Sequence, residues 1–234
     1  IKMAINVDTV YKTVLLILNQ QQRGYMTPDE FNKVATQVQL NIFEKYEDDL
    51  NQQYRVPQND TEYGNRIKNI EENLQFFQRT GATAYAGPHF TITPTDVYRL
   101  GSVFYNGTEL TQYAQRNELT QLLLSPLTQP TTDFPIYLYE NNLLYVYPTS
   151  IQSGITISYL KKPADVNWTY NVGALGQFIY DAGAVNAQNF ELNVSEQTNV
   201  ITRILSYAGV IINDPTIIQV AQQETMQEEQ NSKT

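Results

Sequence analysis

The chain has 234 residues, of which 41% are hydrophobic and 17% charged, a composition typical of a folded protein and not of a disordered one. It contains no cysteine, which excludes disulfides, thiolate nucleophiles and cysteine-ligated metals. Its formal net charge of -9 argues against a basic nucleic-acid-binding surface, but it is compatible with an acidic wall along which DNA slides without sticking.

The N-terminal part predicts three helices, of which the first and the third have simple patterns. In 5–23 apolar residues recur with the i, i+3, i+4, i+7 spacing of a helix, and Gly24 is placed to end it. A third helix is predicted over 61–79, with a one-sided apolar stripe and an end at Gly81.

The second helix, predicted over 27–55, is the organising element. Thr27 and Glu30 are placed to form a capping box, and Pro28 suits the first helical position. Its apolar stripe turns by about a third of a turn along the helix. The first set is Phe31, Val34, Ala35, Val38 and Ile42, the second is Phe43, Leu50 and Tyr54, and Tyr46 lies between the two sets. This pattern predicts either two neighbours, the N-terminal bundle and then another layer or subunit, or one curved packing surface.

The middle of the chain predicts strands, one short helix and long loops. Asn106-Gly107 is a strong hairpin signal, because a type I′ turn needs positive φ at both central residues. A second hairpin is predicted to turn at 140–142, and 164–193 is expected to be an extended excursion. The predicted strands are 90–93, 97–105, 136–139, 143–147, 155–159 and 178–180, and the predicted helix is 115–124.

The C-terminal part predicts a return to helix. Ser195 is expected to cap one helix that Gly209 bends or ends, and Asp214-Pro215 to start a last one. Residues 222–234 are polar and are expected to be disordered or to order on a partner.

The order of elements predicts an α+β fold with segregated layers. We expect an N-terminal helical bundle with a long second helix, central antiparallel β hairpins in a small sheet, and C-terminal helices returning to the bundle. The predicted parts are 1–81, 82–193 and 194–234, within one integrated structural unit. No secretory signal is recognised, and Met3 is expected to lie close to the natural start.

The sequence contains no motif for phosphate binding, dinucleotide binding or nucleophilic catalysis. We therefore predict no enzyme, no catalytic, cofactor-binding or metal-binding residues, and no cofactor. The lone His89 is expected to be structural, with catalysis as the alternative. Acidic residues gather on the second and third predicted helices and in the loop between them; they are Glu44, Glu47, Asp48, Asp49, Asp60, Glu62, Glu71 and Glu72. They predict a solvated face, with a DNA-facing or partner-facing acidic patch and, more remotely, a hydrolase as alternatives.

Trp168 is the only tryptophan of the chain. It is expected to plug the edge of the sheet, and the functional alternative is an anchor in an interface. Together with the 17 tyrosines and the polar loop 167–193 it also motivates a virion host-recognition or glycan-binding module, because sugars stack on aromatic faces.

Several stretches together resemble virion structural proteins of tailed phages infecting Bacteroidota, especially crAss-like phages. The stretches are Asp8–Lys12, Gln22–Asn32, Asn117–Leu119, Ser125–Pro130, Phe134–Tyr139 and Ile157–Pro163 with Trp168 shortly after. In those phages the arrangement is similar to the ring or adaptor proteins between portal and tail. The resemblance covers roughly 8–168, and 174–234 contributes nothing to it.

The resemblance implies a head–tail connector in the virion, at the portal vertex, assembled in the host cytoplasm. Such proteins form closed rings of about twelve copies through head-to-tail contacts. Their implied partners are further copies of the chain, the portal protein and the adjacent tail ring proteins. Genomic DNA would pass through the channel without specific binding, and no membrane is involved.

Overall fold

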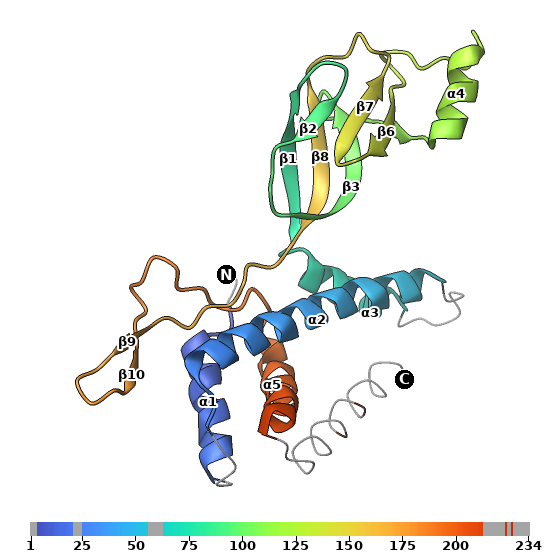
Figure 1. The fold of residues 1–234 in the computed structure, drawn as a ribbon. Coiled ribbons are helices and arrows are strands. Elements are labelled where there is room, and N and C mark those ends of the chain that lie inside the picture. Colours follow the sequence, from blue (N-terminus) through green and yellow to red (C-terminus); the bar gives the residue numbers. More distant parts are fainter. Residues whose placement is uncertain (1–3, 21–24, 56–62, 213–222, 224–225, 227–234) are drawn as a thin grey trace. The chain divides into compact units, whose positions relative to one another are not determined.

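The computed structural model describes residues 4–20, 25–55, 63–212, 223 and 226 (Figure 1). The chain divides into two compact units. One, called here the helical unit, is built from 1–76 and 163–234, and the other, the barrel unit, comprises 77–162. The barrel unit is therefore inserted in the sequence between two parts of the helical unit. It begins between α3 and β1 and ends directly after β8.

The helical unit is built from the two ends of the chain. Its helices are α1 (Val7–Gln20), α2 (Pro28–Arg55), α3 (Tyr63–Leu74), the short η1 (Val194–Glu196) and α5 (Gln197–Ile212). The C-terminal α5 packs against both α1 and α2, and α3 packs against α2. This confirms that a C-terminal helix returns to the N-terminal helices. The predicted last helix from Asp214 and the polar tail 222–234 lie outside the described residues, apart from Gln223 and Met226.

The long helix begins as its sequence predicts. The Thr27 backbone N–H donates to the Glu30 carboxylate at 2.9 Å, and the Glu30 N–H donates to the Thr27 hydroxyl at 3.4 Å, which confirms the capping box. Both parts of the turning stripe contain side chains buried within the chain itself. The buried apolar residues of α2 are Phe31, Ala35, Val38, Ile42, Phe43 and Tyr46.

The predicted end of the third helix is wrong. Helix α3 ends at Leu74, and Gln78–Tyr85 forms strand β1, so Gly81 lies inside a strand and does not end a helix. Residues 78–82 pair in antiparallel register with 156–160 of β8. This distant backbone partner outweighs the helical spacing of the local sequence.

The barrel unit contains one eight-stranded sheet in the order β4-β3-β8-β1-β2-β7-β6-β5, together with the helix α4 (Arg116–Leu124). The sheet is larger than the small sheet predicted, and it nearly closes into a barrel. The strands are β1 (Gln78–Tyr85), β2 (Phe90–Ile92), β3 (Val97–Tyr105), β4 (Glu109–Leu110), β5 (Gln112–Tyr113), β6 (Ile136–Glu140), β7 (Leu143–Tyr147) and β8 (Ile155–Lys161).

One short segment joins the two edges of this sheet. Within 109–113, β4 pairs antiparallel with β3, and β5 pairs parallel with β6. Thr111 stands between them, and both its N–H (2.9 Å) and its hydroxyl (2.8 Å) donate to the carbonyl of Val103. The segment thus pairs with β3 at one edge of the sheet and with β6 at the other, so it covers backbone edges that an open sheet would expose.

The predicted hairpin turns are confirmed. Asn106 and Gly107 both have positive φ, at 51° and 78°, and the second hairpin turns through Asn141 and Asn142, with φ of 53° and 61°. Strand β8 buries Ile155, Ile157 and Tyr159 on one face, as its alternating sequence predicts.

Two details near the C-terminal helix differ from the sequence-based expectation. The Asn193 side chain, and not that of Ser195, caps this region by accepting from the Ser195 N–H at 3.4 Å. Gly209 does not end the helix, because α5 continues to Ile212.

The predicted strand 178–180 is confirmed as β10 (Phe178–Tyr180), and it pairs with an unpredicted strand, β9 (Tyr170–Val172).

Candidate functional site

A polar stripe on α2 holds the extended segment 164–168. The Asn32 side chain accepts from the Trp168 N–H at 2.7 Å and donates to its carbonyl at 3.2 Å. The Thr36 hydroxyl accepts from the Val166 N–H at 3.1 Å, and the Gln39 amide donates to the Ala164 carbonyl at 2.7 Å. The i, i+4, i+7 spacing of the three side chains places them on one helix face, and alternate backbone positions of the segment meet them.

Trp168 is thereby fixed in the centre of an aromatic cluster. Its indole lies 4.4 Å from the Tyr11 ring and stacks with Tyr170 at 5.8 Å and with Tyr180 at 5.6 Å between ring centroids. The indole Nε1 donates to Asp8 at 3.1 Å. Trp168 is only 3% exposed, so it is a packing residue of the helical unit and not an exposed interface anchor.

Beyond this cluster the chain forms a two-stranded hairpin, residues 170–180, which we call the arm (Figure 1). The register pairs Tyr170 with Tyr180 and Val172 with Phe178, and directly paired residues of a hairpin share a face. One face of the arm is therefore apolar and mostly aromatic. Near the base, the Thr169 hydroxyl donates to the Asp181 carbonyl, and the Asp181 N–H donates to the Thr169 carbonyl at 3.0 Å.

The arm exposes an unusual amount of apolar side chain. Leu175 at the apex is 92% exposed, Val172 is 64% exposed and Ile179 is 51% exposed. Exposed apolar residues that gather on one element mark interaction surfaces more often than singly scattered ones do. The sequence predicts an extended excursion with one strand at 178–180, and its partner strand β9 is missed because glycines and amides hide the strand pattern. The available signal was the absence of any charged residue from 166 to 180.

A groove lies between the arm and α1. It encloses about 500 Å³ and is lined by Tyr11, Lys12, Leu15, Tyr25, Trp168, Gly176, Gln177 and Phe178. Most of these side chains are apolar or aromatic, and Lys12 pairs with Asp8 at 2.6 Å. Burial raises the pKa of Tyr11, as does its neighbour Tyr25, and the Tyr11 hydroxyl donates to the Met26 carbonyl at 3.1 Å. The groove therefore suits an apolar, uncharged occupant.

The net negative charge of the chain belongs to the helical unit. The barrel unit contains five basic and five acidic residues, so its formal net charge is zero and the remaining -9 belongs to the helical unit. These ten residues are Arg79, Arg99, Arg116, Lys161, Lys162, Asp96, Glu109, Glu118, Asp133 and Glu140.

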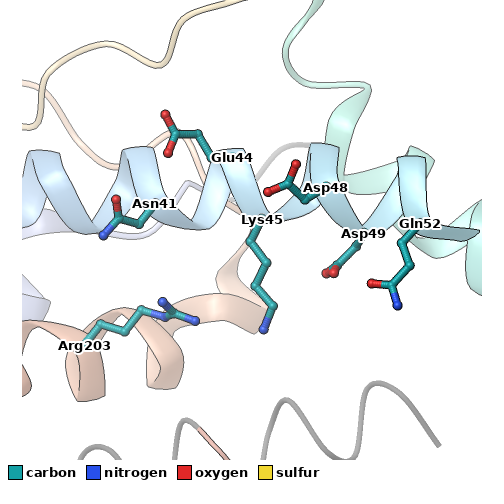
Figure 2. Close-up of a pocket in the computed structure, with 7 residues that line it drawn as sticks. All are labelled: Asn41, Glu44, Lys45, Asp48, Asp49, Gln52 and Arg203. Atoms are coloured by element: carbon teal, nitrogen blue, oxygen red, sulfur yellow. The ribbon is translucent and has the colours of Figure 1, made fainter.

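Three acidic residues of α2, Glu44, Asp48 and Asp49, line an open cavity of about 400 Å³ facing α5 (Figure 2). Its lining residues are Asn41, Glu44, Lys45, Asp48, Asp49, Gln52 and Arg203. Figure 2 shows Lys45 extending from α2 toward the helix that carries Arg203, whereas Glu44 points away from it. Glu44 and Asp48 are solvent-exposed, and Asp60 and Glu62 lie outside the described residues. The cavity mixes both signs of charge and is mostly polar, as a solvated helix face would be.

The barrel unit has a cavity of its own, of about 350 Å³. It is lined by the first half of β3 and by residues of β5 and β6, and tyrosines make up much of its wall. Its lining residues are Tyr98, Arg99, Leu100, Gly101, Tyr113, Tyr137 and Tyr139. Aromatic faces beside a guanidinium are suited to a polar ligand with apolar faces, such as a sugar.

The remaining residues singled out in the sequence do not come together. His89 packs its ring 5.7 Å from Tyr145 in the barrel unit, and Glu71 and Glu72 are exposed on α3. Within residues 4–20, 25–55 and 63–212, no three His, Asp or Glu side chains are grouped as a metal ion would require. The described helices include none that is long and apolar enough to cross a membrane.

Comparison with known proteins adds no assignment. The chain matches no family model, and no curated protein is significantly similar to it.

Proposed function

We propose that the chain is a virion structural protein, a subunit of an oligomeric ring that joins the portal to the tail of a tailed phage and lines its DNA channel. The observation that carries this proposal is the arm, an exposed, uncharged, apolar hairpin on a rigid aromatic base. A monomer gains nothing from such a surface, whereas a subunit of a closed assembly buries it.

The resemblance to phage ring proteins supports the same proposal. Asp8 and Tyr11 belong to the first resembling stretch, Asn32 to the second, and Trp168 to the last. In the structure all four meet at the aromatic cluster that holds the arm. These residues carry the resemblance and are far apart in the sequence, but they contact one another in a single cluster.

The charge distribution is also suited to this role. A channel wall must repel or ignore DNA phosphates, and a helical unit with a formal charge of -9 would do so. In this proposal the exposed acids of α2, including Glu44 and Asp48, contribute to that wall. The protein then works by symmetric assembly and not by catalysis.

The test is the mass and shape of the full-length protein, alone and mixed with the co-encoded portal protein. Light scattering and negative-stain microscopy should show rings, or portal complexes of about twelvefold symmetry. The measurement with the portal protein is needed because a ring can require the portal as a template. A protein that stays monomeric and ignores the portal would overturn the proposal.

The tyrosine-lined cavity of the barrel unit favours a second candidate, a virion module that binds host surface glycans. Trp168 is too buried to serve as the sugar platform, whereas Tyr113 is 51% exposed at this cavity. Binding of bacterial surface polysaccharide that is lost in Tyr113→Ala and kept in Tyr85→Ala, an exposed tyrosine of the same unit, would support it. Absence of binding to polysaccharide and to host cells would exclude it.

A further inference from the structure

We infer that the arm of one copy docks into the groove beside α1 of a neighbouring copy, with Leu175 as the inserted side chain. The inference rests on the proposed ring function and specifies the contact between its subunits. It makes the arm and the groove the two different surfaces of a head-to-tail interface, the kind of contact from which rings close.

The arm needs a cover that its own copy does not provide. A two-stranded hairpin on its own is marginally stable in water, and this one leaves Leu175, Val172 and Ile179 more than half exposed. The groove of the same copy is lined by Gly176, Gln177 and Phe178 but not by Leu175. The apex leucine of one copy therefore does not fill that copy's groove.

Hydrogen bonds within the apex fix the conformation of its turn. The Gly173 N–H donates to the Gln177 carbonyl at 2.8 Å, and the Gly176 N–H donates to the Gly173 carbonyl at 2.9 Å. The Leu175 N–H donates to the Gln177 side chain at 3.0 Å, and Gly176 has the positive φ, 78°, that the turn requires. A preorganised apex loses little conformational entropy on docking.

The distribution of charge favours a second copy as the occupant. Two helical units, each with a formal charge of -9, repel one another wherever their acidic surfaces meet. The arm carries no charged residue, and α1 carries one cation, Lys12, and one acid, Asp8, so its formal net charge is zero. Arm and α1 are thus surfaces through which two copies can approach without repulsion.

The same charges disfavour the other occupants of an apolar arm. Nucleic acid binding requires lysine or arginine at the contact, and the arm has neither. Anionic lipid headgroups attract basic segments and would repel the acidic helical unit. The neighbouring copy is the partner for which both the apolar surface and the charge fit.

The absence of native cysteines allows a direct test by site-specific cross-linking in the full-length chain. Leu175→Cys protein is mixed with Leu15→Cys protein that carries a mass tag, with and without the portal protein, under mild oxidation. We expect a mixed disulfide dimer of the two variants. Separate proteins are used because a disulfide between them can form only between copies. Val185→Cys mixed with Leu15→Cys is the matched control, because Val185 is fully exposed in the same unit but lies outside the arm.

A second variant gives an independent measure. Leu175→Asp should abolish the rings or portal complexes of the unmodified protein while leaving far-UV circular dichroism unchanged, because Leu175 is 92% exposed and its loss costs no core packing. Val185→Asp should leave assembly intact. The carboxylate introduced by Leu175→Asp would have to be buried in the apolar groove of the neighbour, whose lining residues include one cation, Lys12, which is already paired with Asp8.

The outcomes separate this inference from the proposed function. Rings or portal complexes that form without the mixed disulfide would overturn the contact between arm and groove and leave the proposed ring function standing. A disulfide between two Leu175→Cys copies would indicate that arms pair with arms, and it would also overturn the contact between arm and groove. A mixed disulfide without rings or portal complexes would support the contact and overturn the ring function. Flotation of the native protein with anionic vesicles, lost in Leu175→Asp and without the mixed disulfide, would assign the arm to a membrane instead.

Discussion

The indole Nε1 of Trp168 donates a hydrogen bond of 3.1 Å to the carboxylate of Asp8, across 160 positions of the sequence. Asp8 lies in the first turn of α1, and Trp168 lies at the base of the arm. The contact therefore joins the N-terminal helix α1 to the base of the arm, which we propose to be the assembly contact. It also makes the single tryptophan an intrinsic reporter of the helical unit, because its surroundings change when that unit unfolds.

Asp8→Ala should destabilise the helical unit by about 1–3 kcal/mol, because a buried indole N–H loses its acceptor. The measurement is urea unfolding followed by Trp168 fluorescence. Asp8→Asn, which keeps an acceptor oxygen, should recover most of the loss. Lys12→Ala breaks only the exposed ion pair to Asp8 and should cost at most about 0.5 kcal/mol. Equal effects of Asp8→Ala and Lys12→Ala would show that the indole contact contributes nothing.

Gln39→Ala should be costly although it removes no apolar surface. Gln39 is 1% exposed, donates to the Ala164 carbonyl at 2.7 Å and accepts from the Glu191 N–H at 2.7 Å. Truncation leaves two backbone groups without these partners, at a cost of about 3 kcal/mol. Gln37→Ala on the exposed side of the same helix is the control and should change stability by less than about 0.5 kcal/mol. The prediction fails if the two variants unfold at the same urea concentration.

Local signals account for the parts of the fold that the sequence predicts well. The Asn106-Gly107 turn, the second hairpin and the capping box of α2 depend on residues within a few positions of one another. Strand β1 and the closure of the barrel depend on distant partners. The segment 109–113 is too short to show a strand pattern, and it is ordered by β3 on one side and β6 on the other.

The candidate site shows the same difference between features that the local sequence predicts and features that depend on distant contacts. Trp168 stands out in the sequence because it is unique, but its partners Asp8, Tyr11 and Asn32 are identified only by tertiary contacts. The i, i+4, i+7 spacing of Asn32, Thr36 and Gln39 resembles an ordinary polar helix face. Only the structure shows that this face holds an extended segment instead of water.

Gly81→Ala should destabilise the barrel unit by about 1–3 kcal/mol. A Cβ atom at this position would lie 2.6 Å from Pro94 Cγ and 3.0 Å from Tyr159 Cε1, so neighbouring atoms must move. The measurement is amide hydrogen exchange of the barrel strands, with Trp168 fluorescence recorded in parallel for the helical unit. Ala82→Ser, at an exposed position of the same strand, is the control. Unchanged exchange in Gly81→Ala would contradict the close packing of this glycine.

The helical unit should lose stability in alkali through Tyr11. Burial, together with Tyr25, raises the pKa of Tyr11 above its ordinary value of 10.0 in the folded protein. The neutral phenol is therefore favoured by folding, so this contribution to stability is complete below pH 10 and is lost as the pH rises above it. Far-UV circular dichroism in urea should show a falling midpoint as the pH passes about 10.

Tyr11→Phe provides the decisive comparison for this pH dependence. The variant loses the hydrogen bond to the Met26 carbonyl, at a cost of about 1 kcal/mol at neutral pH, but it has no phenol to ionise. Its stability should therefore fall less steeply in alkali than that of the native protein. Tyr46→Phe should act in the same direction, because burial and then Glu196 raise the pKa of Tyr46 as well. Tyr85→Phe, an exposed position of the barrel unit, should leave the alkaline slope unchanged, and equal slopes in all four proteins would show that buried phenols do not govern it.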